Sequence, residues 1–224
     1  KKMLLSKIKI DKTIKVVMDC GNAAGAICGP EIFKNFNIEL TELFCNIDGT
    51  FPNHHPDPTV EENLIDLMGK MKTGKYDVGI AFDGDADRIG VVDEKGEVIW
   101  ADQLMALFLP EIVSPGDEIL YDVKCSKSLE EMIVKYGGKP VMWKTGHSLV
   151  KQKMLDLKCK FGGEMSGHIF FADDFYGFDD GIYVATRLLQ TLSRTSKTLS
   201  ELKDELPKYF STPEMRLEAK SDDT

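Results

Sequence analysis

Short apolar runs alternate with helical patterns along the chain. KVVMDC, IELTELF and YDVGIAFD each hold six to eight mostly apolar residues, a length typical of buried strands rather than helices. In the first hundred residues these runs predict strands over 15–20, 38–44 and 76–83, and then a hairpin over 89–100 that turns at Lys95–Gly96. The helices expected between them lie over 21–36 and over 58–72, the second with Thr59 as cap and Glu62 completing a capping box.

The same alternation starts again after residue 100. Helices are expected over 102–113, 126–136, 147–157, 181–193 and 198–206. Strands are expected over 118–123, 140–145, 160–164 and 167–171. Strand–helix alternation of this kind predicts an α/β protein with two successive domains, whose parallel or mixed sheets are covered by helices. We place the domain boundary near 98–103, which gives domains over residues 1–100 and 101–213.

Composition narrows the class of protein. With 42% hydrophobic and 29% charged residues, the chain has the balance of a globular protein. Its formal net charge of −9 argues against non-specific nucleic-acid binding, which needs a basic face. The five cysteines form no CxxC pair, so free buried thiols in a reducing cytoplasm are expected. No apolar run approaches the roughly 18 residues of a membrane span, so no membrane partner is expected.

The strongest candidate for a functional site is the segment AFDGDADRIG, where Asp83, Asp85 and Asp87 directly follow an apolar strand. Carboxylates this close repel one another unless a cation lies among them. Oxygen ligands at alternating positions suit a hard cation, and Mg²⁺ suits a loop that offers only a few of them. The loop is also at the end of a strand, where open α/β sheets bind ligands. An EF-hand is excluded, because Arg88 stands where its loop needs glycine.

A second interpretation of this segment is a phosphatase of the haloacid-dehalogenase type. There a strand is followed by D-x-D, and the first aspartate, here Asp83, is the nucleophile. Lys124 and the pair Asp179–Asp180 could fill the later roles. A D-x-D alone is weak evidence, and this motif continues as DGDADR.

Several segments together resemble the α-D-phosphohexomutases, the phosphomannomutase/phosphoglucomutase family. They are, in order, DGTFPNHHPDP (48–58), DGDADR (83–88), DVKCS with Lys124, TGHS with His147, and GGEMSGH (162–168). DGDADR resembles the metal loop of the family and GEMSGH its sugar-recognition loop. The resemblance covers essentially the whole chain, and Met165 resembles the mannose/glucose branch.

The resemblance implies a protein of four domains, of which this chain supplies the two in the middle. Residues 1–100 would be domain II with the metal loop, residues 101–213 domain III with the sugar loop, and residues 214–224 the start of a linker toward a fourth domain. The serine-containing TASHNP-type loop and the Arg/Ser/Thr-rich phosphate-binding loop of the family do not occur in this sequence. The chain begins with Lys1, so we expect a piece of a longer protein.

The resemblance also implies an activity and roles for individual residues. The family moves a phosphoryl group between O1 and O6 of a hexose through a phosphoserine and a bisphosphorylated intermediate. Mg²⁺ would be held by Asp83, Asp85 and Asp87, with hexose phosphates as the partners. Arg88, His147 and Lys124 would take part in catalysis, and Glu164, Ser166, His168 and Gly146 would contact the substrate. Glu164 and Ser166 are expected to alternate on an extended segment, so that both point toward the sugar.

A non-catalytic module that binds sugar phosphate or metal is the alternative for the chain as given. The missing serine loop favours this alternative, whereas a longer parent sequence with that loop would favour the mutase.

Overall fold

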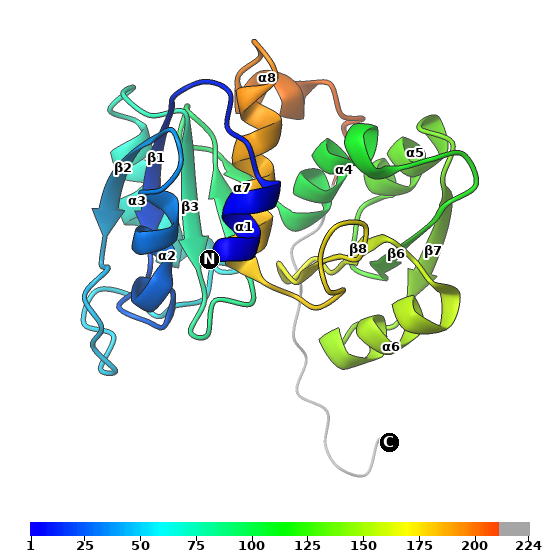
Figure 1. Ribbon diagram of the computed structural model, residues 1–224, viewed down its shortest axis with the longest axis horizontal. Helices are drawn as coiled ribbons and strands as arrows, with labels where there is room; N and C mark the ends of the chain where they lie inside the picture. The colour runs from blue at the N-terminus through cyan, green and yellow to red at the C-terminus, as the bar shows by residue number, and fades with distance from the viewer. Residues whose placement is uncertain (211–224) are drawn as a thin grey trace.

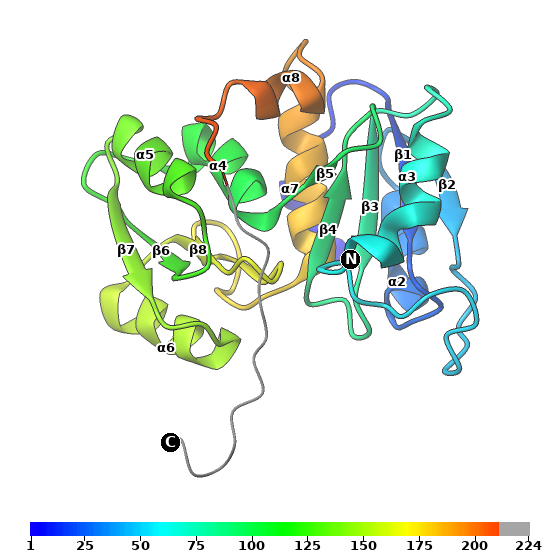
Figure 2. The same cartoon turned by 180° about the vertical axis from the view of Figure 1, so that it is seen from behind.

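The computed structural model describes residues 1–210, which form two sheets with helices on both faces (Figure 1, Figure 2). The predicted class, two successive α/β domains with mixed sheets covered by helices, is confirmed. The predicted linker over 214–224 lies outside the described residues. In chain order the helices are α1 (Lys2–Lys7), α2 (Gly25–Phe33), the 3₁₀ turn η1 (Glu61–Leu64), α3 (Ile65–Met71), α4 (Ala101–Ile112), α5 (Lys127–Lys135), α6 (His147–Leu157), α7 (Gly181–Ser193) and α8 (Leu199–Asp204).

The first sheet has the strand order β2-β1-β3-β4-β5. Its first three strands are parallel, and β4 and β5 run antiparallel to their neighbours. The hairpin between β4 and β5 turns at Lys95–Gly96 as predicted, with Gly96 at φ +79°. The strands are β1 (Ile14–Asp19), β2 (Ile38–Leu43), β3 (Val78–Phe82), β4 (Ile89–Val92) and β5 (Val98–Ile99).

The second sheet, with the order β7-β6-β8-β9, repeats the arrangement of the first four strands of the first sheet. Its first three strands are again parallel and the last is antiparallel. Parallel strands with helical crossovers bring the carboxyl ends of the strands, and the loops that follow them, to one edge of each sheet. The strands are β6 (Glu118–Asp122), β7 (Lys139–Trp143), β8 (Phe161–Gly163) and β9 (Ile169–Phe171).

Both faces of the first sheet are buried. Successive residues of a strand point to opposite faces, so Val17 packs with Leu67 and Met71 of α3, whereas Val16 and Met18 belong to the main core on the other face. Burial on both faces explains why the strands appear in the sequence as continuous apolar runs rather than as an alternating pattern.

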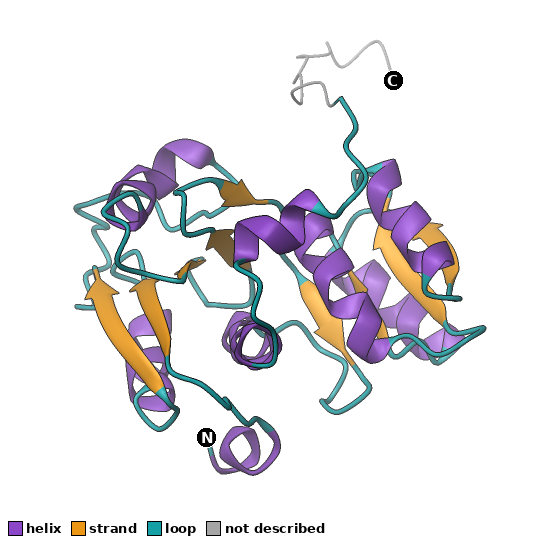
Figure 3. Ribbon diagram, turned by 90° about the horizontal axis from the view of Figure 1, so that it is seen from above, coloured by secondary structure: helices purple, strands orange, loops and turns teal. Residues whose placement is uncertain are grey.

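Helix α7 joins the two units. It follows the second sheet in the sequence but packs on β1, β3 and β4 of the first sheet as well as on β9. Figure 1 shows it between the two sheets, and the view from above in Figure 3 shows helices between the two groups of strands. Nearly every residue of α7 is buried, in a core that continues from one unit into the other.

The capping box predicted at Thr59 and Glu62 is wrong. The Thr59 hydroxyl donates instead to the carboxylate of Asp57, 2.7 Å away, and the helical segment begins as a 3₁₀ turn with no side-chain cap. Asp57 also accepts the backbone N–H of Thr59, a turn that aspartate forms readily with the residue two positions on. The α-helix itself begins only at Ile65. At the amino end, α1 forms a short helix that the sequence pattern did not predict.

No helix within residues 1–210 combines the length and the apolar character that a bilayer span requires. The five cysteines are free, as expected; Cys20, Cys125 and Cys159 are buried, but Cys28 is exposed.

A buried ion pair holds the loop 44–58 against the end of β1. Asp19, the last residue of β1, has no exposed surface, and its Oδ2 lies 3.1 Å from Nε2 of His54. The bond to Asp19 raises the pKa of His54 above its ordinary value, although burial of the ring opposes the shift. Protonated His54 therefore stabilises the folded chain.

We expect this pair to make stability depend on pH. Because the folded pKa of His54 is raised, its contribution is fully present below the ordinary value of 6.5 and is lost as pH rises through the folded pKa. In the wild type the urea midpoint should therefore decline between about pH 6.5 and 8. In His54→Gln this decline should be clearly smaller, since glutamine donates to Asp19 without titrating. The control is His55→Gln at the neighbouring, exposed histidine, which leaves the pair intact. Equal pH dependence in wild type and His54→Gln would contradict the assignment.

Candidate functional site

The metal loop, defined here as residues 83–88, connects β3 to β4. Asp83 follows β3 directly and is buried, and its Oδ1 accepts the backbone N–H of Arg88 at 3.1 Å. Ala86 has a left-handed backbone, with φ +65°, which curls the loop back on itself. As a result Asp83, Asp85 and Asp87 each bring one carboxylate oxygen within 4.8 Å of the others.

The electrostatics of the metal loop favour a bound cation. Burial raises the pKa of Asp87 to about 6, and the charges of Asp83, Asp85 and Asp179 add to the shift, while His168 opposes it. A divalent cation among these oxygens would remove the repulsion, and three carboxylates with room for water or phosphate are a donor set that suits Mg²⁺. The residues present therefore fit the metal that the sequence predicts.

Arg88 is held between two carboxylates from different segments. Its Nε donates to Oδ2 of Asp83 at 2.7 Å, and its Nη1 donates to Oδ1 of Asp57 at 3.2 Å. Asp57 was not among the predicted site residues, although it belongs to the segment DGTFPNHHPDP. About a quarter of the Arg88 side chain stays exposed, so the guanidinium is oriented and still accessible.

The sugar loop, defined here as residues 164–168, connects β8 to β9. It is a turn rather than the extended segment that was predicted, since Gly167 N–H donates to the carbonyl of Glu164 at 3.1 Å. Tight pairing of β8 with β9 forces this turn, so Glu164 and Ser166 do not simply alternate on one face. The Glu164 side chain is almost fully buried and accepts the backbone N–H of Gly146, while Ser166 is half-buried. Burial raises the pKa of Glu164, and the bond from Gly146 opposes the shift.

The sugar loop and the metal loop touch each other. The backbones of Arg88 and His168 form an antiparallel bridge, and Ile89 N–H donates to the carbonyl of Gly167 at 3.3 Å. Gly167 has φ +97°, and a Cβ there would lie 2.8 Å from the carbonyl oxygen of Ile89, so only glycine fits this approach. The two predicted loops, about 80 residues apart in the sequence, are thus parts of one site.

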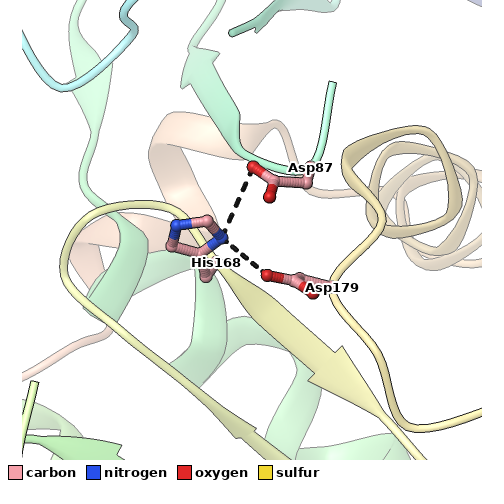
Figure 4. A group of neighbouring side chains, drawn as sticks. All are labelled: Asp87, His168 and Asp179. Carbon is pink, nitrogen blue, oxygen red and sulfur yellow. Dashed lines mark ion pairs between the residues drawn. The ribbon is translucent and has the colours of Figure 1, made fainter. Parts of the chain in front are cut away.

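Three basic side chains lie against Asp179 beside the metal loop. Figure 4 shows one of them, His168, between Asp179 and Asp87. Nδ1 of His168 lies 2.9 Å from Oδ2 of Asp179, Lys151 donates to its Oδ1 at 3.0 Å, and Nδ1 of His147 lies 3.4 Å from its Oδ2. The His168 contact is a close ion pair without the alignment of a hydrogen bond. Burial would raise the pKa of Asp179, but His168 and Lys151 outweigh it and hold that pKa well below its ordinary value.

His168 connects this group to the metal loop. Its Nδ1 also lies 3.5 Å from Oδ1 of Asp87, and its ring stacks on that of His147, with the ring centres 5.3 Å apart. Sequence patterns point to a role for Asp179 only in the phosphatase alternative and to no role for Lys151. The only signal for Asp179 was its place in DDG, directly before a helix.

Helix α7 also fastens the metal loop. Gly181 N–H donates to the carbonyl of Ala86 at 2.9 Å, and a Cβ on Gly181 would lie 2.7 Å from the carbonyl oxygen of Arg88. Asp180 caps the helix by accepting the N–H of Tyr183. The cap and the close approach place Asp179 at the contact between the two units.

The remaining predicted residues lie in loops of the second unit. Gly146 is the residue before α6, with φ +134°, and His147 begins that helix with half of its side chain exposed. Lys124 is exposed in the turn after β6. The structure thus brings the three aspartates, Arg88, Glu164, Gly146, His147 and His168 into connected loops; the roles of all the predicted residues stay predictions.

Two family models match this chain. The model described as "Phosphoglucomutase/phosphomannomutase, alpha/beta/alpha domain II" matches residues 2–96, and the one described as domain III of the same family matches residues 100–210.

Relatives and solved structures agree with that match. A phosphomannomutase/phosphoglucomutase of Pseudomonas putida is 47% identical over 219 residues, which cover 97% of this chain and 47% of the relative. A crystal structure of a phosphoglucomutase/phosphomannomutase family protein from Burkholderia thailandensis has a TM-score of 0.91 at 47% identity and covers 95% of this chain and 46% of that one. At the level of the fold alone, an Aspergillus fumigatus N-acetylphosphoglucosamine mutase in complex with GlcNAc-6P and magnesium has a TM-score of 0.68 at 16% identity, covering 92% of this chain and 48% of that one.

This chain spans about half the length of the curated relatives it matches. The order of the matched segments, the fold and the contact of the two loops agree with one another, and the chain belongs to the phosphoglucomutase/phosphomannomutase family, of which it covers domains II and III.

Proposed function

We propose that this chain is the central part of an enzyme that interconverts hexose 1-phosphate and hexose 6-phosphate, with mannose and glucose phosphates as substrates. The observation that carries the proposal is the backbone bridge between Arg88 and His168. It joins a loop suited to a metal and a phosphoryl group to a loop suited to sugar hydroxyls. A mutase needs both at one place, because the same site must handle the two ends of the sugar.

In this proposal each loop has its own task. Asp83, Asp85 and Asp87 would hold Mg²⁺, which supplies charge neutralisation to the phosphoserine of the parent protein when it is bound. The planar fork of Arg88, oriented by Asp83 and Asp57, would contact an oxygen of the transferring phosphoryl group.

The second unit would recognise the sugar. Glu164 accepts sugar hydroxyls with the carboxylate oxygen that Gly146 does not use, and Ser166 adds a hydroxyl contact. His147 and His168 would pass a proton between a sugar oxygen and the protein. Nδ1 of each ring lies close to Oδ2 of Asp179, at 3.4 Å for His147 and 2.9 Å for His168. Lys124 would support the phosphate charge. The cytoplasmic location expected from the cysteines belongs to this proposal as well.

The family match argues against the phosphatase alternative, because the two models of the mutase family cover residues 2–96 and 100–210. The hydrogen bonds from Arg88 to both oxygens of Asp83 orient this carboxylate and leave lone pairs on each oxygen for a metal.

The test is an assay of the full-length parent protein with glucose 1-phosphate or mannose 1-phosphate, Mg²⁺ and the matching 1,6-bisphosphate. The proposal expects formation of the 6-phosphate, with at least a hundredfold loss in Asp85→Asn, because the metal loop then lacks one charge. Release of inorganic phosphate without isomerisation would refute it.

The 224-residue chain alone is expected to bind Mg²⁺ only weakly, with a dissociation constant on the order of 1 mM. Its three carboxylates leave the other ligand positions to water, because the phosphoserine oxygen is not in this sequence. Titration calorimetry measures the affinity; Asp85→Asn should abolish binding, and Asp48→Asn in the exposed loop 46–51 should not change it. Micromolar binding that survives Asp85→Asn would refute the ligand assignment.

A further inference from the structure

Asp122 has no part in the function proposed above, yet it connects the loops that carry the sugar-contacting residues. It is the last residue of β6 and has no exposed surface. Its Oδ2 accepts the hydroxyl of Thr145 at 2.8 Å, and its Oδ1 accepts the backbone N–H of Met165 at 3.0 Å. The thiol of Cys125 donates to the same Oδ1 at 3.1 Å. Three different loops at the carboxyl edge of the second sheet thus share one buried carboxylate.

The bonds of Asp122 form part of a closed ring. Gly146 follows Thr145, and its N–H donates to the carboxylate of Glu164, which in turn precedes Met165. The path from Asp122 through Thr145 and Gly146 to Glu164 and Met165 therefore returns to Asp122. Two buried carboxylates, Asp122 and Glu164, thus connect Thr145 and Gly146, directly before α6, to the sugar loop.

Such a ring has one well-defined arrangement. The two acceptor carboxylates are buried, and a buried carboxylate that loses its donors is costly, so a slip of either loop would break several bonds at once. The ring fixes which oxygen of Glu164 faces Gly146 and which one is left for a ligand. It also sets the distance between Glu164 and Ser166, because Met165 lies between them and is tied to β6.

We infer that Asp122 is a positioning residue for sugar recognition, which aligns the Glu164 carboxylate and residues 145–148 at the start of α6 with the hydroxyls of a hexose phosphate. The inference rests on the proposed mutase function and names a residue through which its sugar loop is oriented. A displacement of about 1 Å in groups that position a substrate can reduce the rate about hundredfold. Loss of Asp122 should have an effect of that size although the residue itself has no exposed surface.

The variants separate positioning from general stability. Asp122→Ala removes every bond of this carboxylate. The matched control is Asp93→Ala, because Asp93 also has no exposed surface and accepts backbone N–H groups, from Lys95 at 3.0 Å and Glu97 at 2.9 Å, but lies in the β4–β5 hairpin. Thr145→Val opens the ring at one bond with little change of volume, and Thr145→Ser keeps the hydroxyl.

In the full-length parent protein, we expect Asp122→Ala to lower kcat/KM for glucose 1-phosphate about hundredfold, while Asp93→Ala stays within about twofold of wild type at a comparable loss of melting temperature. Thr145→Val should lose about tenfold, and Thr145→Ser should recover most of that loss. The double variant Asp122→Ala/Thr145→Val should be no worse than Asp122→Ala, because the two changes break the same bond. A loss in Asp93→Ala as large as in Asp122→Ala, or equal activity in Thr145→Val and wild type, would overturn the inference.

Amide hydrogen exchange tests the ring without any assay of activity. Exchange at Met165 and Gly146 should be at least about tenfold faster in Asp122→Ala than in Asp93→Ala. If Asp122→Ala does not fold, the same comparison between Thr145→Val and Thr145→Ser decides. A parent protein that shows no mutase activity, but has the expected exchange pattern, would refute the proposed function and leave the ring in place. Unchanged exchange at both amides would refute the ring itself.

Discussion

The 224-residue chain by itself is expected to convert neither glucose 1-phosphate nor mannose 1-phosphate to its 6-phosphate, even when Mg²⁺ and a hexose 1,6-bisphosphate are supplied. The proposed function needs a serine that carries the phosphoryl group, as the resemblance implies, and no loop of that type occurs in this sequence. Without the carrier, the metal loop has no phosphoserine oxygen beside it. The loss is complete rather than partial, because a covalent step is missing.

Binding of substrate to the chain alone should be feeble as well. The hydroxyl contacts of Glu164 and Ser166 are a few hydrogen bonds worth about 0.5–3 kcal/mol each, which scarcely exceeds the entropy lost on association. Phosphorus NMR of the purified chain with each sugar phosphate measures both isomerisation and hydrolysis, and a full-length relative serves as the positive control. Isomerisation would show that the phosphoryl carrier is not needed. Hydrolysis that disappears in Asp83→Asn would favour the phosphatase alternative.

Replacing Arg88 by alanine in the full-length parent protein should lower kcat/KM about hundredfold. Removing one oriented donor from a charge that develops in the transition state typically costs about 3 kcal/mol. In this molecule the change also leaves Asp57 and the buried Asp83 without their shared cation, which adds negative charge beside the phosphoryl group. Steady-state kinetics with glucose 1-phosphate measures the effect.

The variant Arg88→Lys tests whether the positive charge at this position is sufficient or the planar guanidinium is needed. Lysine keeps the positive charge but cannot bond Asp83, Asp57 and a phosphoryl oxygen with one planar group, so we expect an intermediate loss of about tenfold. Arg194, which is partly exposed and paired with Asp11 and Glu111 away from the two loops, provides the control variant Arg194→Ala. If Arg88→Ala stays within about twofold of wild type, Arg88 is only a structural cation.

The sequence by itself determined the class of fold and the chemistry of the metal loop. Buried parallel strands must be apolar on both faces, so runs such as YDVGIAFD mark them without further information. The alternating Asp83, Asp85 and Asp87 needed no tertiary structure either, because three carboxylates within five residues lie close together in any compact turn. The sugar loop could also be found from the sequence, because GGEMSGH is one continuous motif.

Only the tertiary structure decided how these segments form one site. The bridge between Arg88 and His168 joins residues 80 positions apart, and Asp179 reaches the site because α7 crosses from the second sheet to the first. The local signal of single aspartates such as Asp57, Asp122 and Asp179 does not distinguish them, since an aspartate at a strand end or before a helix is common in any α/β chain. Their partners come from distant loops, so the pattern of neighbouring residues could not reveal them.

The wrong predictions have the same physical origin. Thr59 has the residue type and spacing of a helix cap, but the nearby carboxylate of Asp57 competes for its hydroxyl. Glu164 and Ser166 alternate as in a strand, but the pairing of β8 with β9 turns the segment between them. A local pattern states which bonds a residue can make, and packing of distant segments selects among them.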